Sequence, residues 1–149
     1  MNCKSLCVSP VRADGGVARS LILFGVESSF TPEFLETAGR LGDAVVAAIL
    51  TGELEWDLTG LPVEPTPAPP PALLSLPVAI PWVTPGLRFA RWRLALETGF
   101  SEPASLVDPS AVIAATARLA TGIYINSCAS IGAHASLDDG VLINRPVAN

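Results

Sequence analysis

The sequence predicts an α/β chain in which a small parallel-sheet unit is followed by a β-solenoid. Between residues 20 and 50, two apolar strand-like runs flank a helix, as in a βαβ unit. Closer to the end of the chain, an aliphatic residue recurs every six positions, at Val107, Ile113, Leu119, Ile125, Ile131, Leu137 and Ile143. A period of six fits neither a helix nor a flat strand. It fits a coil that turns a corner every six residues and points one aliphatic side chain per face inward.

The βαβ unit is predicted from the composition of its segments. Ser20–Gly25 and Ala44–Leu50 are short continuous apolar runs, which are typical of buried parallel strands. Thr31, Pro32 and Glu33 indicate the start of the intervening helix, with an N-cap, a proline in the first turn and an acidic residue beside it. The crossover between the two strands is therefore expected to be right-handed.

Prolines dominate the next part of the chain. A Pro-rich loop over residues 62–71 is expected to be extended, because proline disfavours helix and regular sheet. Leu76–Val83 is predicted as a third strand, and its two prolines place it at an edge of the sheet.

A second helix is predicted over residues 86–98. Four apolar residues are expected on its buried face: Leu87, Ala90, Leu94 and Ala95. Arg88, Arg91 and Arg93 lie mostly elsewhere on this helix. Arginines can grip a phosphate, but a solvated helix face is the favoured interpretation here.

Composition excludes several classes of protein. The net charge of −5 and the scattered basic residues argue against a nucleic-acid partner, and no apolar run is long enough to span a membrane. The N-terminus lacks the apolar region of a secretory signal. Cys3, Cys7 and Cys128 are expected to be reduced thiols, and the sequence predicts a cytoplasmic protein. No metal site is expected, because one histidine cannot form a three-histidine site.

A family resemblance rests on two features of the sequence. One is the set of six-residue repeats between Leu106 and Ile143, and the other is the segment Val107-Asp108-Pro109-Ser110-Ala111, which joins the first domain to the repeats. The chain resembles the sugar O-/N-acyltransferases related to sialic acid O-acetyltransferase and to the bacterial N-acetyltransferases of nucleotide-linked amino sugars. The resemblance covers residues 20–149. It implies a Rossmann-like nucleotide-sugar-binding domain over residues 20–101 and an incomplete left-handed β-helix over residues 105–149. Residues 1–19 are expected to form a disordered extension.

The same resemblance implies an activity and a set of site residues. The expected donor is acetyl-CoA, the expected acceptor is a nucleotide-linked sugar, and the expected assembly is a homotrimer formed through the β-helix. Gly25, Thr51 and Glu53 are the candidate substrate-binding residues in the first domain. Asn144 matches the family's asparagine beside the acceptor, and an asparagine ladder inside a turn is the alternative interpretation.

No catalytic residue is assigned within the chain. Acyl transfer needs a base, and the family's histidine is expected two residues beyond Asn149, so the chain is predicted to stop before it. His134, the only histidine, is expected to point outward and to be structural rather than to act as that base.

Two hypotheses about function follow. The first is a member or fragment of an acyl-CoA-dependent sugar acyltransferase. The alternative is a catalytically inactive relative that serves as a binding or assembly module. It is favoured by Val26–Phe30, which replace the family's glycine-rich turn and place Glu27 where it would repel a diphosphate. A nicotinamide dehydrogenase is excluded, because no G-x-G-x-x-G follows the first strand.

Overall fold

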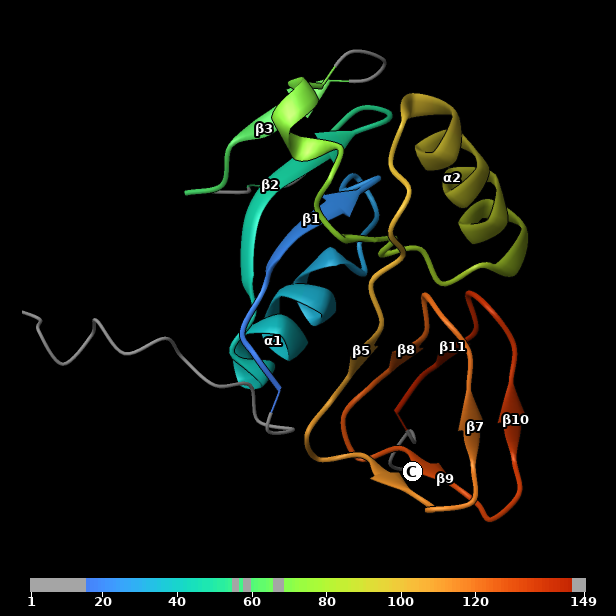
Figure 1. Ribbon diagram of the computed structural model, residues 1–149. Coiled ribbons are helices and arrows are strands. Elements are labelled where there is room, and N and C mark those ends of the chain that lie inside the picture. Colours follow the sequence, from blue (N-terminus) through green and yellow to red (C-terminus); the bar gives the residue numbers. More distant parts are fainter. Residues whose placement is uncertain (1–15, 55–56, 58–59, 66–68, 146–149) are drawn as a thin grey trace, which may run out of the picture.

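The computed structural model describes residues 16–54, 57, 60–65 and 69–145. A parallel sheet with two helices forms one part of the molecule, and a three-sided coil of short parallel strands forms the other (Figure 1). The prediction of an α/β fold with parallel sheets is therefore confirmed. Most of the expected disordered extension, residues 1–15, lies outside the described residues. Arg19, at its end, is held in place by Asp43 and by the Ser105 carbonyl oxygen, so ordered structure begins before residue 20.

The sheet has the strand order β3-β2-β1-β4, and its neighbouring strands pair in parallel. Its strands are β1 (Ser20–Phe24), β2 (Ala44–Leu50), β3 (Val63–Pro65) and β4 (Val78–Ala79). The first two lie where the sequence predicts strands.

The Pro-rich region differs from the prediction in one respect. Its first residues form β3, which pairs with β2 at one edge of the sheet. Proline is tolerated there because an edge strand leaves one row of backbone groups unpaired. The third predicted strand is reduced to β4, whose outer side is covered by residues 102–104 through the bridge Val78–Pro103. A short 3-10 helix, Pro71–Leu73, lies between β3 and β4.

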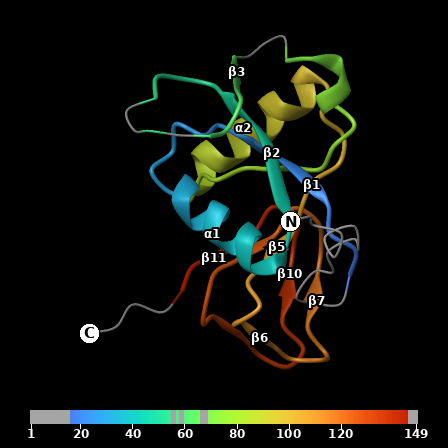
Figure 2. The same ribbon diagram turned by 90° about the vertical axis from the view of Figure 1, so that its left-hand side faces the viewer.

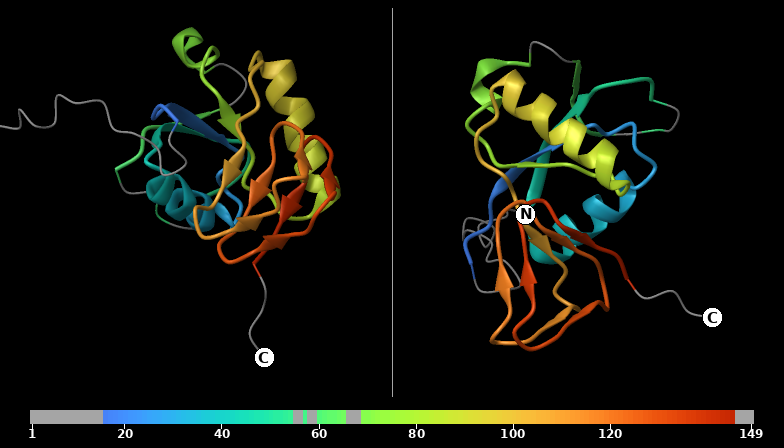
Figure 3. Two further views of the ribbon diagram at one scale, coloured as in Figure 1. Left: turned by 60° about the horizontal axis from the view of Figure 1, so that its bottom comes forward. Right: turned by 90° about the vertical axis from the view of Figure 1, so that its right-hand side faces the viewer.

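The helices α1 (Thr31–Leu41) and α2 (Pro85–Thr98) lie on opposite faces of the sheet (Figure 3). The alternation along β1 places Leu21 and Leu23 in one core with α1, while Ile22 and Phe24 pack in the other core with α2. The predicted N-cap is wrong in detail, because Thr31 lies inside the helix and its hydroxyl donates to the Val26 carbonyl oxygen at 3.1 Å.

The buried face predicted for α2 is partly wrong. Leu87 and Ala90 are exposed, whereas Arg88 is buried together with Ala95. The helix itself lies where it is predicted, but periodicity misassigned its buried face, because the guanidinium of Arg88 meets backbone carbonyl groups that hydrophobicity does not reveal. These contacts are described below.

The coil consists of seven two-residue strands that begin every six residues: β5 (Leu106–Val107), β6 (Val112–Ile113), β7 (Arg118–Leu119), β8 (Tyr124–Ile125), β9 (Ser130–Ile131), β10 (Ser136–Leu137) and β11 (Leu142–Ile143). Strands 18 residues apart pair in parallel and form three faces: β5-β8-β11, β6-β9 and β7-β10. Each circuit of the coil therefore lies on the preceding one, which is how such a chain satisfies its backbone hydrogen bonds.

Six of the seven predicted inward residues pack together inside the coil: Val107, Ile113, Ile125, Ile131, Leu137 and Ile143. Leu119 is the exception, with 37% of its surface exposed. It lies on β7 in the first circuit, where β10 is the only strand paired with it. The face β5-β8-β11 turns its other side toward the sheet unit, and Leu106, Tyr124 and Leu142 join the core beneath α1 (Figure 2).

The interior of the coil gives a direct test of this packing. Ile125 is fully buried between Val107 and Ile143, its partners in register on the neighbouring strands. We expect Ile125→Ala to lower the free energy of unfolding by about 2–4 kcal/mol, because it leaves a cavity. Val112→Ala, an outward residue that is 67% exposed, should change it by less than about 0.5 kcal/mol in the same urea titration. Equal effects of the two variants would contradict the inward assignment.

Candidate functional site

The first candidate site lies at the carboxyl ends of the parallel strands. The chain passes from β1 to β2 and β3 on one side and later returns to β4 on the other side of β1. Ligands of open parallel sheets bind at such a switch point, outside the carboxyl ends of the strands. Here the turn after β1 carries Gly25 and Glu27, the segment after β2 carries Thr51, and the segment after β4 carries Trp82.

Gly25 and Trp82 are packed tightly against each other at this edge. Gly25 has a φ of 86°, and a β-carbon added to it would lie 2.7 Å from the indole nitrogen of Trp82. Glycine is therefore required both for its backbone conformation and for the close approach of the indole. Within the described residues, the Trp82 N–H is buried without a hydrogen-bond partner.

Glu27, in the turn after β1, is hydrogen-bonded to Thr51, the residue that follows β2. Its carboxylate accepts hydrogen bonds from the Thr51 backbone N–H, at 3.2 Å, and from the Thr51 hydroxyl. The Arg91 guanidinium donates to the same hydroxyl at 3.1 Å and lies 3.8 Å from the carboxylate. Arg91 also stacks over Trp82, 4.5 Å from the ring centroid. These four residues, Glu27, Thr51, Trp82 and Arg91, are called the crevice cluster below.

The predicted site residues of this domain are thus only partly brought together. Thr51 belongs to the crevice cluster, and Gly25 packs against its member Trp82. Glu53 is exposed, two residues beyond Thr51. Arg91 belongs to the helix whose arginines were expected on a solvated face, and for this residue the expectation is wrong. Its position depends on Trp82, which lies before the helix, and on Thr51, which lies 40 residues away in the sequence, so periodicity alone could not reveal it.

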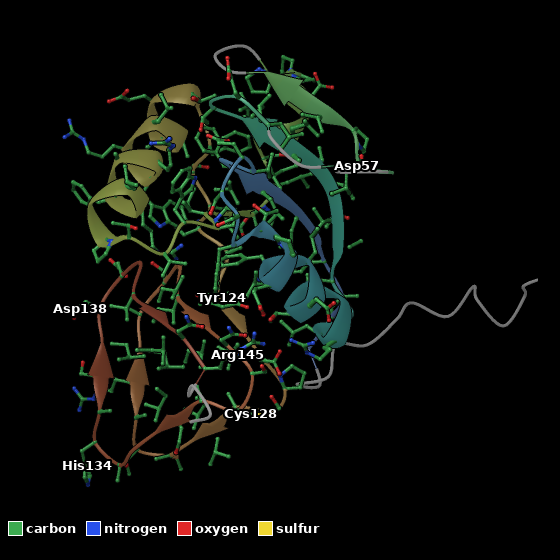
Figure 4. The ribbon with its side chains drawn as sticks, turned by 180° about the vertical axis from the view of Figure 1, so that it is seen from behind. Asp57, Tyr124, Cys128, His134, Asp138 and Arg145 are labelled. Carbon is green, nitrogen blue, oxygen red and sulfur yellow. The ribbon has the colours of Figure 1, made fainter. Side chains whose placement is uncertain are left out.

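The second candidate site lies where the coil meets α1. The Tyr124 ring stacks on Phe34 with centroids 3.9 Å apart and meets Phe30 edge-on. Its hydroxyl lies 2.8 Å from that of Thr37, where either can donate to the other, and 3.1 Å from the Glu33 carbonyl oxygen. Burial raises the pKa of Tyr124 to about 12, so it is a neutral phenol at physiological pH. Figure 4 shows Tyr124 at this junction.

Asp108 completes the same buried network. Its carboxylate accepts hydrogen bonds from Thr37 at 3.2 Å and from Arg40 at 2.7 Å, and from both the backbone N–H and the hydroxyl of Ser110. Burial alone would raise the pKa of Asp108, but the hydrogen bonds from Ser110 and Arg40 outweigh it and hold the pKa below its usual value. Asp108 is therefore a carboxylate in the folded protein.

Asn144, the candidate acceptor-side residue, is tied to this network through Asn126. The buried Asn126 amide donates to Asn144 Oδ1 at 2.9 Å, and the Arg145 backbone N–H donates to the same oxygen. The predicted alternative, an asparagine ladder, is thus present. Arg145 pairs with Glu33 at 3.1 Å, which places the exposed end of the ladder beside the first turn of α1 (Figure 4).

Arg88 provides a second tie between the two parts of the molecule. It donates to the carbonyl oxygens of Gly140 at 2.7 Å, Gly122 at 2.9 Å, and Ile80. Burial lowers its pKa to about 10, and it still carries its charge at neutral pH. The glycines stand at coil corners with positive φ, where the backbone turns. Arg88 therefore holds the end of β4 and two corners of the coil together.

His134, the one histidine of the sequence, lies away from both sites. His134 is exposed at a corner with a φ of 62°, and its backbone N–H donates to the Thr116 hydroxyl. The outward orientation predicted for it is confirmed (Figure 4). Among the described residues, no group of three histidine, cysteine or acidic side chains could hold a metal ion. Neither α1, α2 nor another helix in the described part of the chain has the length and apolar character of a membrane span.

Comparison with known proteins identifies the fold. No protein-family model matches the chain, and no curated protein is similar to it. Among solved structures, it is similar to perosamine N-acetyltransferase from Caulobacter crescentus, solved as a histidine-to-asparagine variant with CoA and GDP-perosamine. The TM-score is 0.69 at 22% identity, over 84% of this chain and 60% of that one.

A second neighbour is the acetyltransferase domain of PglB from Neisseria gonorrhoeae, in complex with acetyl coenzyme A. Here the TM-score is 0.65 at 20% identity, over 86% of this chain and 65% of the other. The chain thus spans less than two thirds of the length of either neighbour, and it has the fold of these acetyltransferases.

The lowered pKa of Asp108 makes stability dependent on pH. A carboxyl whose pKa is lower in the folded state stabilises the fold above its unfolded pKa of about 4, and this contribution is lost as the pH falls through the folded value. We expect Asp108→Asn to cost about 2 kcal/mol or more at pH 7 and to flatten the loss of stability in acid. Urea titrations between pH 2.5 and pH 7 test this. Asp138→Asn, an exposed change on the same coil, should leave the acid dependence nearly intact, and identical profiles for the two variants would refute the assignment.

Proposed function

We propose that the chain belongs to a CoA-dependent sugar acyltransferase that transfers an acetyl group to an amine or hydroxyl of a nucleotide-linked sugar. This proposal rests on one observation, that both parts of the molecule together are similar in structure to such an enzyme. A match over 84% of the chain has to include the sheet unit and the coil together. In this proposal the sheet unit is a Rossmann-like domain and the coil is a left-handed β-helix of hexapeptide repeats.

The proposed reaction is direct transfer. The acceptor nitrogen or oxygen attacks the thioester carbon of acetyl-CoA, the carbon–sulfur bond breaks, and CoA leaves as the thiolate and takes up a proton. The acceptor gives its own proton to a base, which by family resemblance is a histidine. His134 lies at an exposed corner and is not proposed for this role.

Asn144 is the residue proposed to meet the acceptor. Both hydrogen bonds that its side chain makes within the coil end on Oδ1, from Asn126 and from the backbone of Arg145. The orientation of the amide is thereby fixed, and Nδ2, which has no partner among the described residues, is proposed to donate to an oxygen of the substrate. Gly25, Thr51 and Glu53 are proposed to face the nucleotide part. The assembly is proposed to be a homotrimer in the cytoplasm.

The alternative is a catalytically inactive relative that binds or assembles without transferring an acetyl group. The crevice cluster favours it, because Glu27 and Trp82 occupy the space at the carboxyl ends of β1 and β2. A carboxylate in that position opposes a diphosphate. The two functions differ in one measurable property, the transfer of acetyl groups.

Acetyl transfer by the full gene product tests the proposal. We expect release of the CoA thiol from acetyl-CoA in the presence of a GDP- or UDP-linked amino sugar, and a higher melting temperature with acetyl-CoA alone. Asn144→Ala should lower kcat/KM about tenfold, which corresponds to the loss of one hydrogen bond of about 1.4 kcal/mol in the transition state. Val112→Ala, on the outside of β6, is the matched control and should leave it unchanged. Absence of both transfer and acetyl-CoA stabilisation would reject this function in favour of the alternative.

A further inference from the structure

The crevice cluster is built as an anion site. Its donors are the Thr51 backbone N–H, the Thr51 hydroxyl and the Arg91 guanidinium, and they converge on the Glu27 carboxylate. Backbone N–H groups together with an arginine are the usual partners of a phosphoryl group. The acid that they meet comes from the turn directly after β1, at the position where open parallel sheets receive ligands.

The arginine of this site is oriented in advance. The Arg91 guanidinium is held over the Trp82 ring and donates through Nε to Thr51, and its side chain is only 22% exposed. An arginine held in this way loses little conformational freedom when it binds an anion. The Glu27 side chain is 7% exposed, so this carboxylate is an integral part of the site and not a surface group that happens to lie nearby.

The indole N–H of Trp82 lies against Gly25 and, like that of Trp92, is buried without a hydrogen-bond partner in the described part of the chain. Its place beside Gly25 puts this donor at the turn that carries Glu27, so a ligand that displaces Glu27 would meet it there.

From these contacts we infer that Glu27 is an internal ligand of a phosphoryl-binding site and keeps it closed. A nucleotide diphosphate group enters when the turn over residues 25–30 moves and Glu27 leaves Thr51 and Arg91. The inference rests on the proposed function only for the identity of the ligand as a nucleotide diphosphate. In this inference Glu27, which otherwise favours an inactive relative, sets how tightly the crevice binds a phosphoryl group.

The test compares binding of GDP and of inorganic pyrophosphate by calorimetry to the full chain and its variants. Removing the internal competitor raises the population of the open site, and apparent affinity rises in proportion. Glu27→Ala therefore binds both probes at least about tenfold more tightly than the unchanged protein, and guanosine, which lacks phosphate, gains nothing. Adding Arg91→Met to Glu27→Ala abolishes the gain. Glu97→Ala, which removes the same charge from an exposed position on α2, leaves the affinity unchanged.

Equal affinity of Glu27→Ala and the unchanged protein, with or without measurable binding, would overturn the inference, as would an equal gain in Glu97→Ala. If Glu27→Ala does not fold, Glu27→Gln removes the charge at nearly the same volume and is subject to the same criteria. Acetyl-CoA binding is measured separately on the unchanged protein. Failure to bind acetyl-CoA would count against the proposed function, and it would leave this test of the crevice unaffected.

Discussion

The structure depends on a small buried network where the coil meets α1. A coil with so few circuits cannot bury its own faces and ends, and a repeat array of this kind needs a cap. The sheet unit supplies a covering surface, because Tyr124 stacks on Phe34 while its hydroxyl reaches Thr37. Asp108, from the coil, accepts hydrogen bonds from Thr37 and from Arg40, which both belong to α1. Since each of these polar groups is satisfied by another member, the network fixes the position of the coil face against the helix.

The coil-side candidate site follows directly from that placement. Asn126 connects the network to Asn144, so the proposed acceptor-side amide takes its orientation from groups buried beneath α1. The crevice cluster lies on the turn that leads from β1 into the same helix. Arg88 joins the opposite side of the sheet unit to two corners of the coil. The two parts of the molecule are thus held together at two places, by the buried network on the α1 side and by Arg88 on the α2 side.

The sequence predicts the repeating and local features well and the long-range polar contacts poorly. The period of six locates all seven coil strands, and continuous apolar runs locate β1 and β2, because these signals are repeated along the chain. Arg88 and Arg91 were assigned to solvent because their partners are carbonyl groups and side chains distant in sequence. Glu27 was expected only to repel a phosphate, since nothing local indicates that Thr51 and Arg91 converge on it. Leu119 fits the repeat and is nevertheless 37% exposed, and nothing in the repeat distinguishes it from the six residues that are packed inside.

A double-mutant cycle between Thr37 and Tyr124 tests the central claim, that the network couples α1 to the coil. Urea unfolding would be measured for Thr37→Ala, Tyr124→Phe and the double variant. We predict a single transition seen equally by tryptophan fluorescence and circular dichroism, and a coupling free energy of about 1 kcal/mol between the two hydroxyl groups. Additive effects, within about 0.3 kcal/mol, or separate transitions for the sheet unit and the coil, would contradict the account.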